Sequence, residues 1–113
     1  MYISAVILSF NAGKTLPRCL DNLIDVLQSY DDDSEIFVVE NGSIDSAPEV
    51  LAGYAERHPN LIKPIVFDHN TGTTFSRNAA IRQASGRYVL ILDSDAYVNK
   101  QAIDSLTTYL END

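Results

Sequence analysis

The stretch "RYVLILDSDA", Arg87 to Ala96, decides the fold. Five consecutive apolar residues, 88–92, are typical of a strand buried inside a sheet. This strand runs directly into Asp93 and Asp95, and alternation along an extended chain predicts that residues i and i+2 point to the same side. Two carboxylates that close repel each other unless a cation or hydrogen-bond donors lie beside them. We therefore expect a cation or a cluster of donors at the end of this strand.

Strand patterns alternate with helical patterns along the whole chain. Strands are expected at 2–10, 35–39, 62–67 and 88–92, and helices at 16–27, 46–58, 74–85 and 99–110. Pro64 predicts that the strand around it lies at a sheet edge or is short. Four strand–helix units in a row predict an α/β fold with right-handed crossovers. The expected architecture is a three-layer αβα, Rossmann-like parallel sheet of about four strands with helices on both faces.

Local signals predict where the helices begin and end. Thr15 is expected to cap the first helix, and "SAPE", Ser46 to Glu49, has the pattern of a capping box. Gly86 is expected to end the third helix. Arg77 falls in the first turn of that helix, where a cation opposes the helix dipole. The placement of Arg77 therefore predicts an anion nearby.

Composition favours a soluble globular domain of 113 residues, with 45% hydrophobic and 21% charged residues. The net charge of −8 argues against binding to nucleic acid. Much of this acidity is interpreted as solvated surface, for example at Asp31 to Glu35. No apolar run approaches the roughly 20 residues of a membrane span, and no basic segment precedes the first apolar stretch. We expect a cytoplasmic location, with Cys19 as a small core residue.

Polar segments follow each of the four expected strands. Ligands of parallel α/β sheets bind outside the carboxyl ends of the strands. The candidate segments are therefore 9–11, 40–45, 68–74 and 93–95.

Two enzyme classes that use an apolar strand ending in acid fit the sequence poorly. "NAGKT", Asn11 to Thr15, ends like a P-loop, but Leu8 holds the place of the glycine that lies five residues before Gly13 in that motif. The aspartyl-phosphate phosphatases continue with a small β-branched residue two places after the second aspartate, and here that residue is Tyr97.

Three longer segments fit a third class. "AVILSFNAGKTLPRCLDNL" (5–23), "EIFVVENGSIDSAPEVL" (35–51) and "NTGTTFSRNAAIRQASGRYVLILDSDA" (70–96) together resemble the N-terminal, nucleotide-sugar-binding half of family-2 glycosyltransferases with the GT-A fold. The resemblance covers nearly the whole chain, in order and at the expected spacing. It implies a transferase of hexosyl groups with an inverting mechanism.

The resemblance also implies a role for individual residues. The positions that match the family's donor-binding segments are Ser9, Phe10, Asn11, Glu40, Asn41, Asn70, Gly72, Arg77, Asp93 and Ser94. The first three correspond to the base pocket, and Glu40 with Asn41 corresponds to residues that read base and ribose. Asp95, together with Asp93, corresponds to the residues that hold a divalent metal, Mg²⁺ or Mn²⁺, on the diphosphate.

Further expectations concern partners. The resemblance implies a UDP or dTDP sugar as donor, with the acceptor site and its catalytic base beyond the aspartates. Residues 1–113 are therefore expected to form the donor-binding part, with the acceptor half absent and the catalytic residue unknown. We expect the isolated chain to transfer no sugar and to pair as a homodimer through an exposed sheet edge. A full-length enzyme is expected to lie peripheral to the inner face of the membrane.

Two other functions stay open at this point. One is a nucleotide-sugar-binding module, or a structural remnant, without turnover. The other is a fragment of a P-loop-like nucleotide hydrolase.

Overall fold

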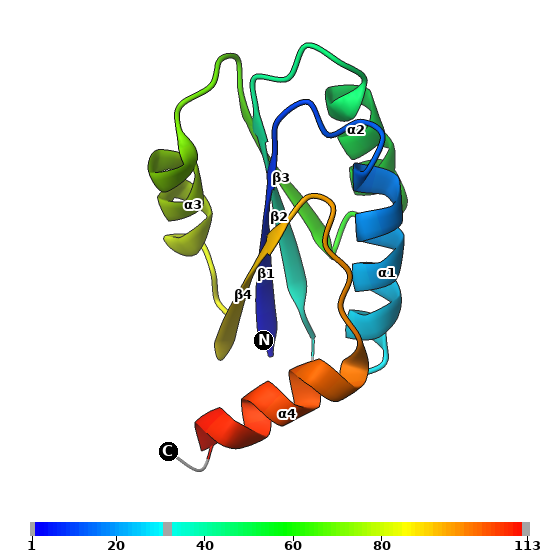
Figure 1. Ribbon diagram of the computed structural model, residues 1–113, viewed down its shortest axis with the longest axis vertical. Helices are drawn as coiled ribbons and strands as arrows, with labels where there is room; N and C mark the ends of the chain where they lie inside the picture. Colours follow the sequence, from blue (N-terminus) through cyan, green and yellow to red (C-terminus); the bar gives the residue numbers. More distant parts are fainter. Residues whose placement is uncertain (1, 31–32, 112–113) are drawn as a thin grey trace.

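The computed structural model describes residues 2–30 and 33–111, in which strands and helices alternate (Figure 1). The elements are β1 (Ile3–Ser9), α1 (Leu16–Gln28), β2 (Glu35–Asn41), α2 (Ala47–Arg57), β3 (Ile62–Phe67), α3 (Thr73–Ile81), β4 (Tyr88–Asp93) and α4 (Lys100–Glu111). The predicted alternation is confirmed. The interpretation of Asp31 and Asp32 as solvated surface lies outside the described residues.

The four strands form one parallel sheet with the order β3-β2-β1-β4. β1 is central, and Leu8 near its end pairs with Val39 on one side and with Asp93 on the other. The strands therefore end at a common edge, as the α/β prediction requires. β3 lies at the opposite edge of the sheet from β4, in agreement with the edge position that Pro64 predicts.

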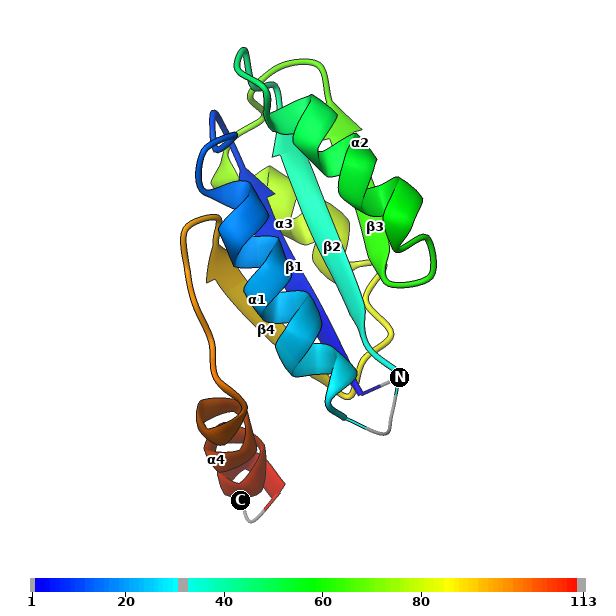
Figure 2. The ribbon, with the colours of Figure 1, turned by 90° about the vertical axis from the view of Figure 1, so that its right-hand side faces the viewer.

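Helices cover both faces of the sheet (Figure 2). α1 and α2 pack on one face over a large apolar core that includes Ile7, Leu20 and Leu51. α3 packs on the other face over a smaller core that includes Phe37 and Ala80. The predicted three-layer, Rossmann-like arrangement is confirmed. α4 lies beyond the amino ends of the strands instead of on a face (Figure 1).

β4 is less buried than its apolar sequence predicts. α3 contacts β1 and β2 and leaves the same face of β4 uncovered, so that 45% of Val89 and 44% of Ile91 are exposed. Tyr88, Leu90 and Leu92 instead pack beside the large core. The apolar run of β4 therefore packs against the core on one face, and its other face is exposed.

Two predicted helix ends also differ from the structure. Ser46 makes no capping hydrogen bond through its side chain; the Ala47 N–H donates instead to Asp45 Oδ1 at 3.0 Å. The predicted capping box is therefore wrong, and Asp45 supplies the cap. Thr15 occupies the N-cap position of α1 but makes no capping bond there.

Gly86 has a different role from the predicted helix stop, because α3 already ends at Ile81. A Cβ at Gly86 would lie 2.5 Å from the Ser4 nitrogen and 2.9 Å from the Ile3 carbonyl carbon. The Gly86 N–H donates to Ser4 Oγ at 2.7 Å. A glycine is therefore needed here, because the segment that leads into β4 passes too close to the β1 backbone to leave room for a Cβ.

Glu35 is fully buried, so its interpretation as solvated surface is wrong. Burial opposes its ionisation, but hydrogen bonds from Lys63 Nζ at 2.6 Å, Ser4 Oγ at 2.5 Å and the Ser85 N–H at 2.7 Å outweigh that effect. The pKa of the Glu35 carboxyl is therefore lowered. This carboxylate ties three strands and the segment before β4 together at the amino end of the sheet.

None of the helices within the described residues has the length and hydropathy that a membrane span requires.

The close approach at Gly86 predicts opposite effects of two glycine substitutions. Gly53 lies inside α2 with no other atom within 4 Å of a Cβ, so Gly53→Ala should raise the free energy of unfolding by roughly 0.5–1 kcal/mol. Gly86→Ala should lower it by about 1–3 kcal/mol, because backbone atoms of β1 must move. Urea unfolding of both variants measures the two changes. A Gly86→Ala protein as stable as the wild type would contradict the account.

Candidate functional site

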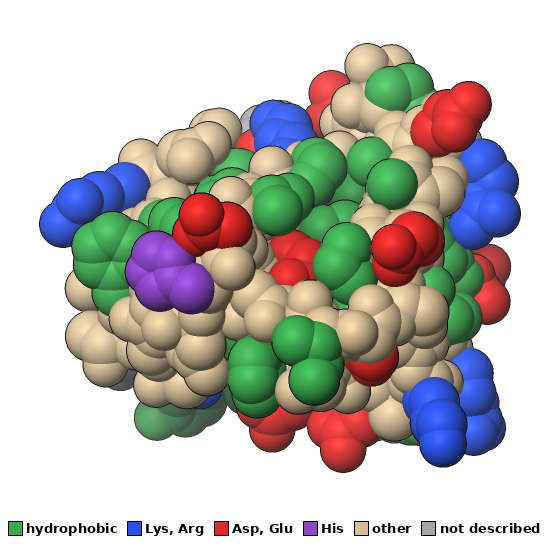
Figure 3. Space-filling model, turned by 90° about the horizontal axis from the view of Figure 1, so that it is seen from above, with side chains coloured by type: hydrophobic (Ala, Val, Ile, Leu, Met, Phe, Trp, Pro, Cys, Tyr) green, Lys and Arg blue, Asp and Glu red, His purple; other side chains and the backbone are tan. Residues whose placement is uncertain are grey.

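A hollow of about 590 Å³ lies at the carboxyl ends of the strands (Figure 3). Its lining residues follow or end all four strands, and they are Leu8, Phe10, Asn11, Ala12, Thr15, Asn41, Asn70, Gly72, Thr73, Asp93, Ser94 and Asp95. The structure therefore brings together most of the residues singled out in the sequence. Ser9, Glu40 and Arg77 do not line the hollow.

Asp93 and Asp95 both line the hollow, but strand alternation is not the reason. β4 ends at Asp93, and the Ala96 N–H donates to the Asp93 carbonyl at 3.0 Å. This hydrogen bond closes a tight turn over residues 93–96. The alternation argument is therefore wrong beyond Asp93, and the turn is what keeps Asp95 beside the same hollow.

Cys19 lies beneath this turn, in the core as predicted. Its Sγ is 3.8 Å from the Asp93 carbonyl oxygen. Burial raises the pKa of the Cys19 thiol to about 11, and the Asp95 carboxylate adds to the rise. The thiol is therefore protonated at neutral pH, in keeping with a role as a small core residue.

Asn41, at the end of β2, holds the loop between β3 and α3. Its Oδ1 accepts hydrogen bonds from the Thr71 N–H at 2.8 Å and from Thr71 Oγ1 at 2.9 Å. Its Nδ2 donates to Asn70 Oδ1 at 3.0 Å, and the Gly72 N–H donates to the same oxygen at 2.8 Å. Gly72 has φ of +83°, which glycine adopts without strain. The loop therefore reaches the hollow in a fixed conformation.

Asn11 fixes the loop between β2 and α2 in a similar way. Its backbone is in the left-handed region, with φ of +52°, which asparagine tolerates better than most residues. Its N–H donates to Ser43 Oγ at 2.8 Å, and its Oδ1 accepts from the Ile44 N–H at 2.9 Å. The loops after β1 and β2 are thereby joined.

Glu40 lies directly below this junction and is only 1% exposed. Its carboxylate accepts hydrogen bonds from the Ser43 N–H at 2.8 Å, from Ser43 Oγ and from Ser9 Oγ at 3.3 Å. Ser9 and Glu40 thus support Ser43, which in turn holds Asn11. Their place in the fold is beneath the hollow instead of on its surface.

The segment that resembles a P-loop is used to attach α1 to α2. The Gly13 N–H, which a P-loop would direct at a phosphate, donates to Asp45 Oδ2 at 2.8 Å. Hydrogen bonds from the backbone N–H groups of Ala47 and Gly13 lower the pKa of the Asp45 carboxyl. A protein carboxylate therefore takes the place that a phosphate would need.

Arg77 is the fifth residue of α3, because that helix begins at Thr73. Its predicted position in the first turn is therefore wrong by one residue. The side chain is half-buried, and within the described part of the chain its Nε is buried without a hydrogen-bond partner. The structure gives this guanidinium no carboxylate partner within 4.0 Å among those residues.

The hollow is acidic. Asp93 and Asp95 are its only charged lining residues among those described, and no lysine or arginine lines it. In Figure 3, blue side chains lie around the margin of this face. No group of three or more His, Cys, Asp or Glu side chains is arranged for metal binding within residues 2–30 and 33–111. Two carboxylates with neighbouring hydroxyl and amide oxygens fit Mg²⁺ or Mn²⁺ when phosphate and water complete the coordination.

Sequence reasoning missed several residues of the site. Leu8, Ala12 and Thr15 line the hollow although they lie outside the candidate segments. Thr73 also lines it and lies inside the candidate segment 68–74, but no role was predicted for it from the sequence. Thr15 was predicted only as a helix cap. It lies in the loop after β1, however, and ligands of parallel α/β sheets bind beside such loops at the carboxyl ends of the strands. Thr71 and Ser43 lie inside the candidate segments 68–74 and 40–45, but no role was predicted for them, because their contacts with Asn41 and Asn11 join segments that are far apart in the sequence.

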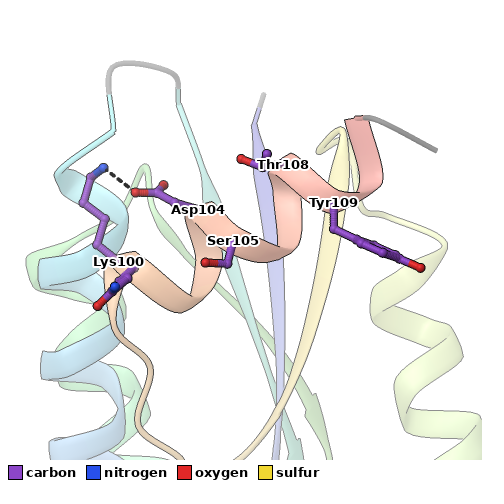
Figure 4. Close-up of a pocket in the computed structure, with 6 residues that line it drawn as sticks. Lys100, Asp104, Ser105, Thr108 and Tyr109 are labelled. Atoms are coloured by element: carbon purple, nitrogen blue, oxygen red, sulfur yellow. Dashed lines mark hydrogen bonds and ion pairs between the residues drawn. The ribbon is translucent and has the colours of Figure 1, made fainter.

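A second, more open hollow of about 710 Å³ lies along the outer side of α4 (Figure 4). All its lining residues belong to that one helix, and Lys100 Nζ already pairs with Asp104 Oδ2 at 3.0 Å. In Figure 4, Ser105, Thr108 and Tyr109 point in different directions. Because these side chains do not converge, we assign the functional site to the strand-end hollow.

Comparison with known proteins identifies the family to which the chain belongs. Residues 4–113 match the model of the family described as glycosyl transferase family 2. The poly(ribitol-phosphate) beta-glucosyltransferase of Bacillus spizizenii is 33% identical over 103 residues, which are 91% of this chain and 16% of that protein.

Two solved structures share the fold. Residues 1–349 of S. aureus TarS in complex with UDP align with a TM-score of 0.80 and 27% identity, over 99% of this chain and 32% of that one. The mannosyltransferase PcManGT of Pyrobaculum calidifontis, in complex with GDP-Man and Mn²⁺, aligns with a TM-score of 0.83 and 25% identity, over 96% and 32%. The chain thus spans a third or less of each of these three proteins. It belongs to glycosyltransferase family 2 and has the GT-A fold.

Proposed function

We propose that residues 1–113 are the donor-binding part of a glycosyltransferase and that the strand-end hollow binds a nucleoside-diphosphate sugar. The observation that carries this proposal is the charge of the hollow: two carboxylates line it, and no basic side chain among the described residues does. A diphosphate can bind beside Asp93 and Asp95 only if a cation lies between them. The Mn²⁺ in the PcManGT complex supports such an arrangement.

We further propose that Asp95 and Asp93 hold Mg²⁺ or Mn²⁺ on the diphosphate. When bound, such an ion stabilises the negative charge that develops on the leaving diphosphate. The hydrogen bond that closes the turn at 93–96 fixes the backbone that carries both carboxylates, and Ser94 between them offers a hydroxyl to the ribose or sugar. A rigid turn of this kind reduces the reorganisation needed when the ion and the nucleotide arrive.

The base is proposed to lie on the other side of the hollow. Phe10 is 49% exposed there and offers an aromatic ring for stacking. Asn11, Asn41, Asn70 and Gly72 form the neighbouring wall. Ser9 and Glu40 would act as positioning residues beneath that wall, and Arg77 would approach the nucleotide from α3. The donor is proposed to be a UDP or dTDP sugar, supported by the UDP complex of TarS.

The nucleotide-sugar-binding module without turnover remains the second candidate. Apart from Asp93 and Asp95, no described residue that lines the hollow is an Asp, Glu or His able to deprotonate an acceptor hydroxyl. Donor binding is therefore the part of the reaction that these residues support. The P-loop alternative has lost its support, since Asp45 accepts the Gly13 N–H.

The charge of the hollow predicts metal-dependent nucleotide binding. Isothermal titration calorimetry should show that UDP or dTDP binds in the presence of Mn²⁺ or Mg²⁺, more tightly than ATP. Chelation of the metal should weaken this binding at least tenfold, which corresponds to about 1.4 kcal/mol. Binding of ATP that is independent of metal and at least as tight as that of UDP would contradict the proposal.

The role of Asp95 predicts the effect of Asp95→Asn. This change keeps the shape of the side chain and removes a charge, so metal-dependent UDP affinity should fall by about 1–3 kcal/mol. Stability without ligand should hold or rise, because one of two neighbouring carboxylates is gone. Asp25→Asn is the matched control, since Asp25 is exposed on α1 and does not line the hollow. Equal UDP affinity of Asp95→Asn and the control would count against the assigned role.

We also propose that the isolated chain dimerises through β4 and transfers no sugar. β3 is protected as an edge strand by Pro64 and the charged Lys63, whereas β4 offers its outer backbone edge and the exposed Val89 and Ile91. Light scattering should therefore show a dimer, and Ile91→Lys should shift it towards monomer. A clean monomer of the wild type at high concentration would refute the dimer, and robust sugar transfer would refute the donor-only role.

A further inference from the structure

Asn22, in the middle of α1, holds the segment that follows the 93–96 turn through two hydrogen bonds. Its Nδ2 donates to the Val98 carbonyl at 2.9 Å, and its Oδ1 accepts the Val98 N–H at 2.8 Å. A backbone N–H can only donate, so the atom that faces it must be the amide oxygen. One half-buried side chain of α1 therefore pairs with both backbone groups of a residue that lies 76 positions further along the chain.

The segment between β4 and α4 has few other attachments. Residues 94–99 belong to no strand or helix, because β4 ends at Asp93 and α4 begins at Lys100. In Figure 1, this segment runs past α1 on its way to α4. The Val98 side chain packs beside the large core. Within residues 2–30 and 33–111, no hydrogen bond other than those of Asn22 joins residues 97–98 to another part of the chain. Asn22 is therefore the main polar attachment of the backbone where it leaves the turn.

Two other residues of α1 contact the same segment. Cys19 Sγ lies 3.8 Å from the Asp93 carbonyl oxygen, and the guanidinium carbon of Arg18 lies 5.5 Å from the centre of the Tyr97 ring. Positions 18 and 19 lie four and three residues before position 22, so the three side chains share one face of the helix. This face of α1 thus contacts the chain on both sides of Asp95.

We propose that Asn22 is a positioning residue for the metal-binding turn, because its hold on Val98 keeps the backbone at Asp95 in place. This inference rests on the proposed function, since it concerns how the same site is ordered. The Ala96 N–H closes the turn on Asp93 with a single hydrogen bond, so contacts outside the turn must fix the chain where it leaves. A carboxylate held in place before an ion arrives requires less reorganisation and loses less entropy on binding. The alternative is that Asn22 only attaches α4 to the domain.

Asn22→Ala and Asn22→Leu both remove the two hydrogen bonds and differ in size, so an effect that they share reports on the hydrogen bonds. Alanine and leucine favour a helix more than asparagine does, which offsets part of the lost stability. At a fixed Mn²⁺ concentration below saturation, calorimetry should show a UDP affinity about tenfold lower in both variants, as is common when residues that orient metal ligands are removed. Amide hydrogen exchange at Ala96 should become faster, because the turn opens more often.

Tyr30→Phe is the matched control. The Tyr30 hydroxyl donates to Asp104 Oδ1 at 2.7 Å, so this change loosens the attachment of α4 and leaves the contacts of residues 93–98 in place. Its UDP affinity and its exchange rate at Ala96 should equal those of the wild type. Circular dichroism and thermal unfolding verify that each variant is folded. A loss of affinity in Tyr30→Phe as large as that in Asn22→Ala would overturn the inference, because attachment of α4 would then be the cause.

A double-mutant cycle tests whether Asn22 acts through Asp95. In the Asp95→Asn background the carboxylate that Asn22 positions is gone, so the addition of Asn22→Ala should lower UDP affinity by less than about threefold. A loss above that limit would show that the two residues act independently and would overturn the inference. Wild-type UDP affinity in both folded Asn22 variants would also overturn it and leave the proposed function intact. Absence of metal-dependent UDP binding by the wild type would overturn the proposed function and this inference with it.

Discussion

Parallel pairing of β1 with β2 on one side and with β4 on the other is the constraint on which the site depends. Leu8 lies opposite Val39 and Asp93, so the chain leaves all three strands at nearly the same level. The loops that follow must therefore gather at one edge of the sheet. This pairing brings Asn11 and Asp95, which are far apart in the sequence, to one hollow.

Side-chain acceptors then hold the gathered loops in place. Glu40, Asn41 and Asp45 each accept at least one backbone N–H from a loop at this edge. Glu40 and Asn41 were singled out in the sequence as residues that touch the ligand, and the structure uses most of their acceptor atoms for the chain itself. Loops that are ordered before binding lose less entropy when a ligand arrives. The same hydrogen bonds decide which polar groups remain free for the ligand.

The sequence predicted those features that depend on local pattern. Apolar periodicity predicted the order of the elements, and Pro64 predicted the edge position of β3. It could not predict features that depend on distant contacts. The burial of Glu35 requires Lys63 and Ser85, and the need for Gly86 comes from its approach to Ser4. Asp95 lines the expected hollow, but the cause is the tight turn that follows β4 and not the alternation of side chains along a strand.

The central claim is that a divalent cation joins the 93–96 turn to a nucleotide. Paramagnetic broadening of backbone amide signals by small amounts of Mn²⁺, measured by NMR with and without UDP, tests it most directly. The account predicts that UDP strengthens the broadening and centres it on Ser94 and Asp95, with weaker effects at Asn11 and Thr15. Broadening that does not depend on UDP, or that centres on other acidic surfaces such as Asp104, would contradict it.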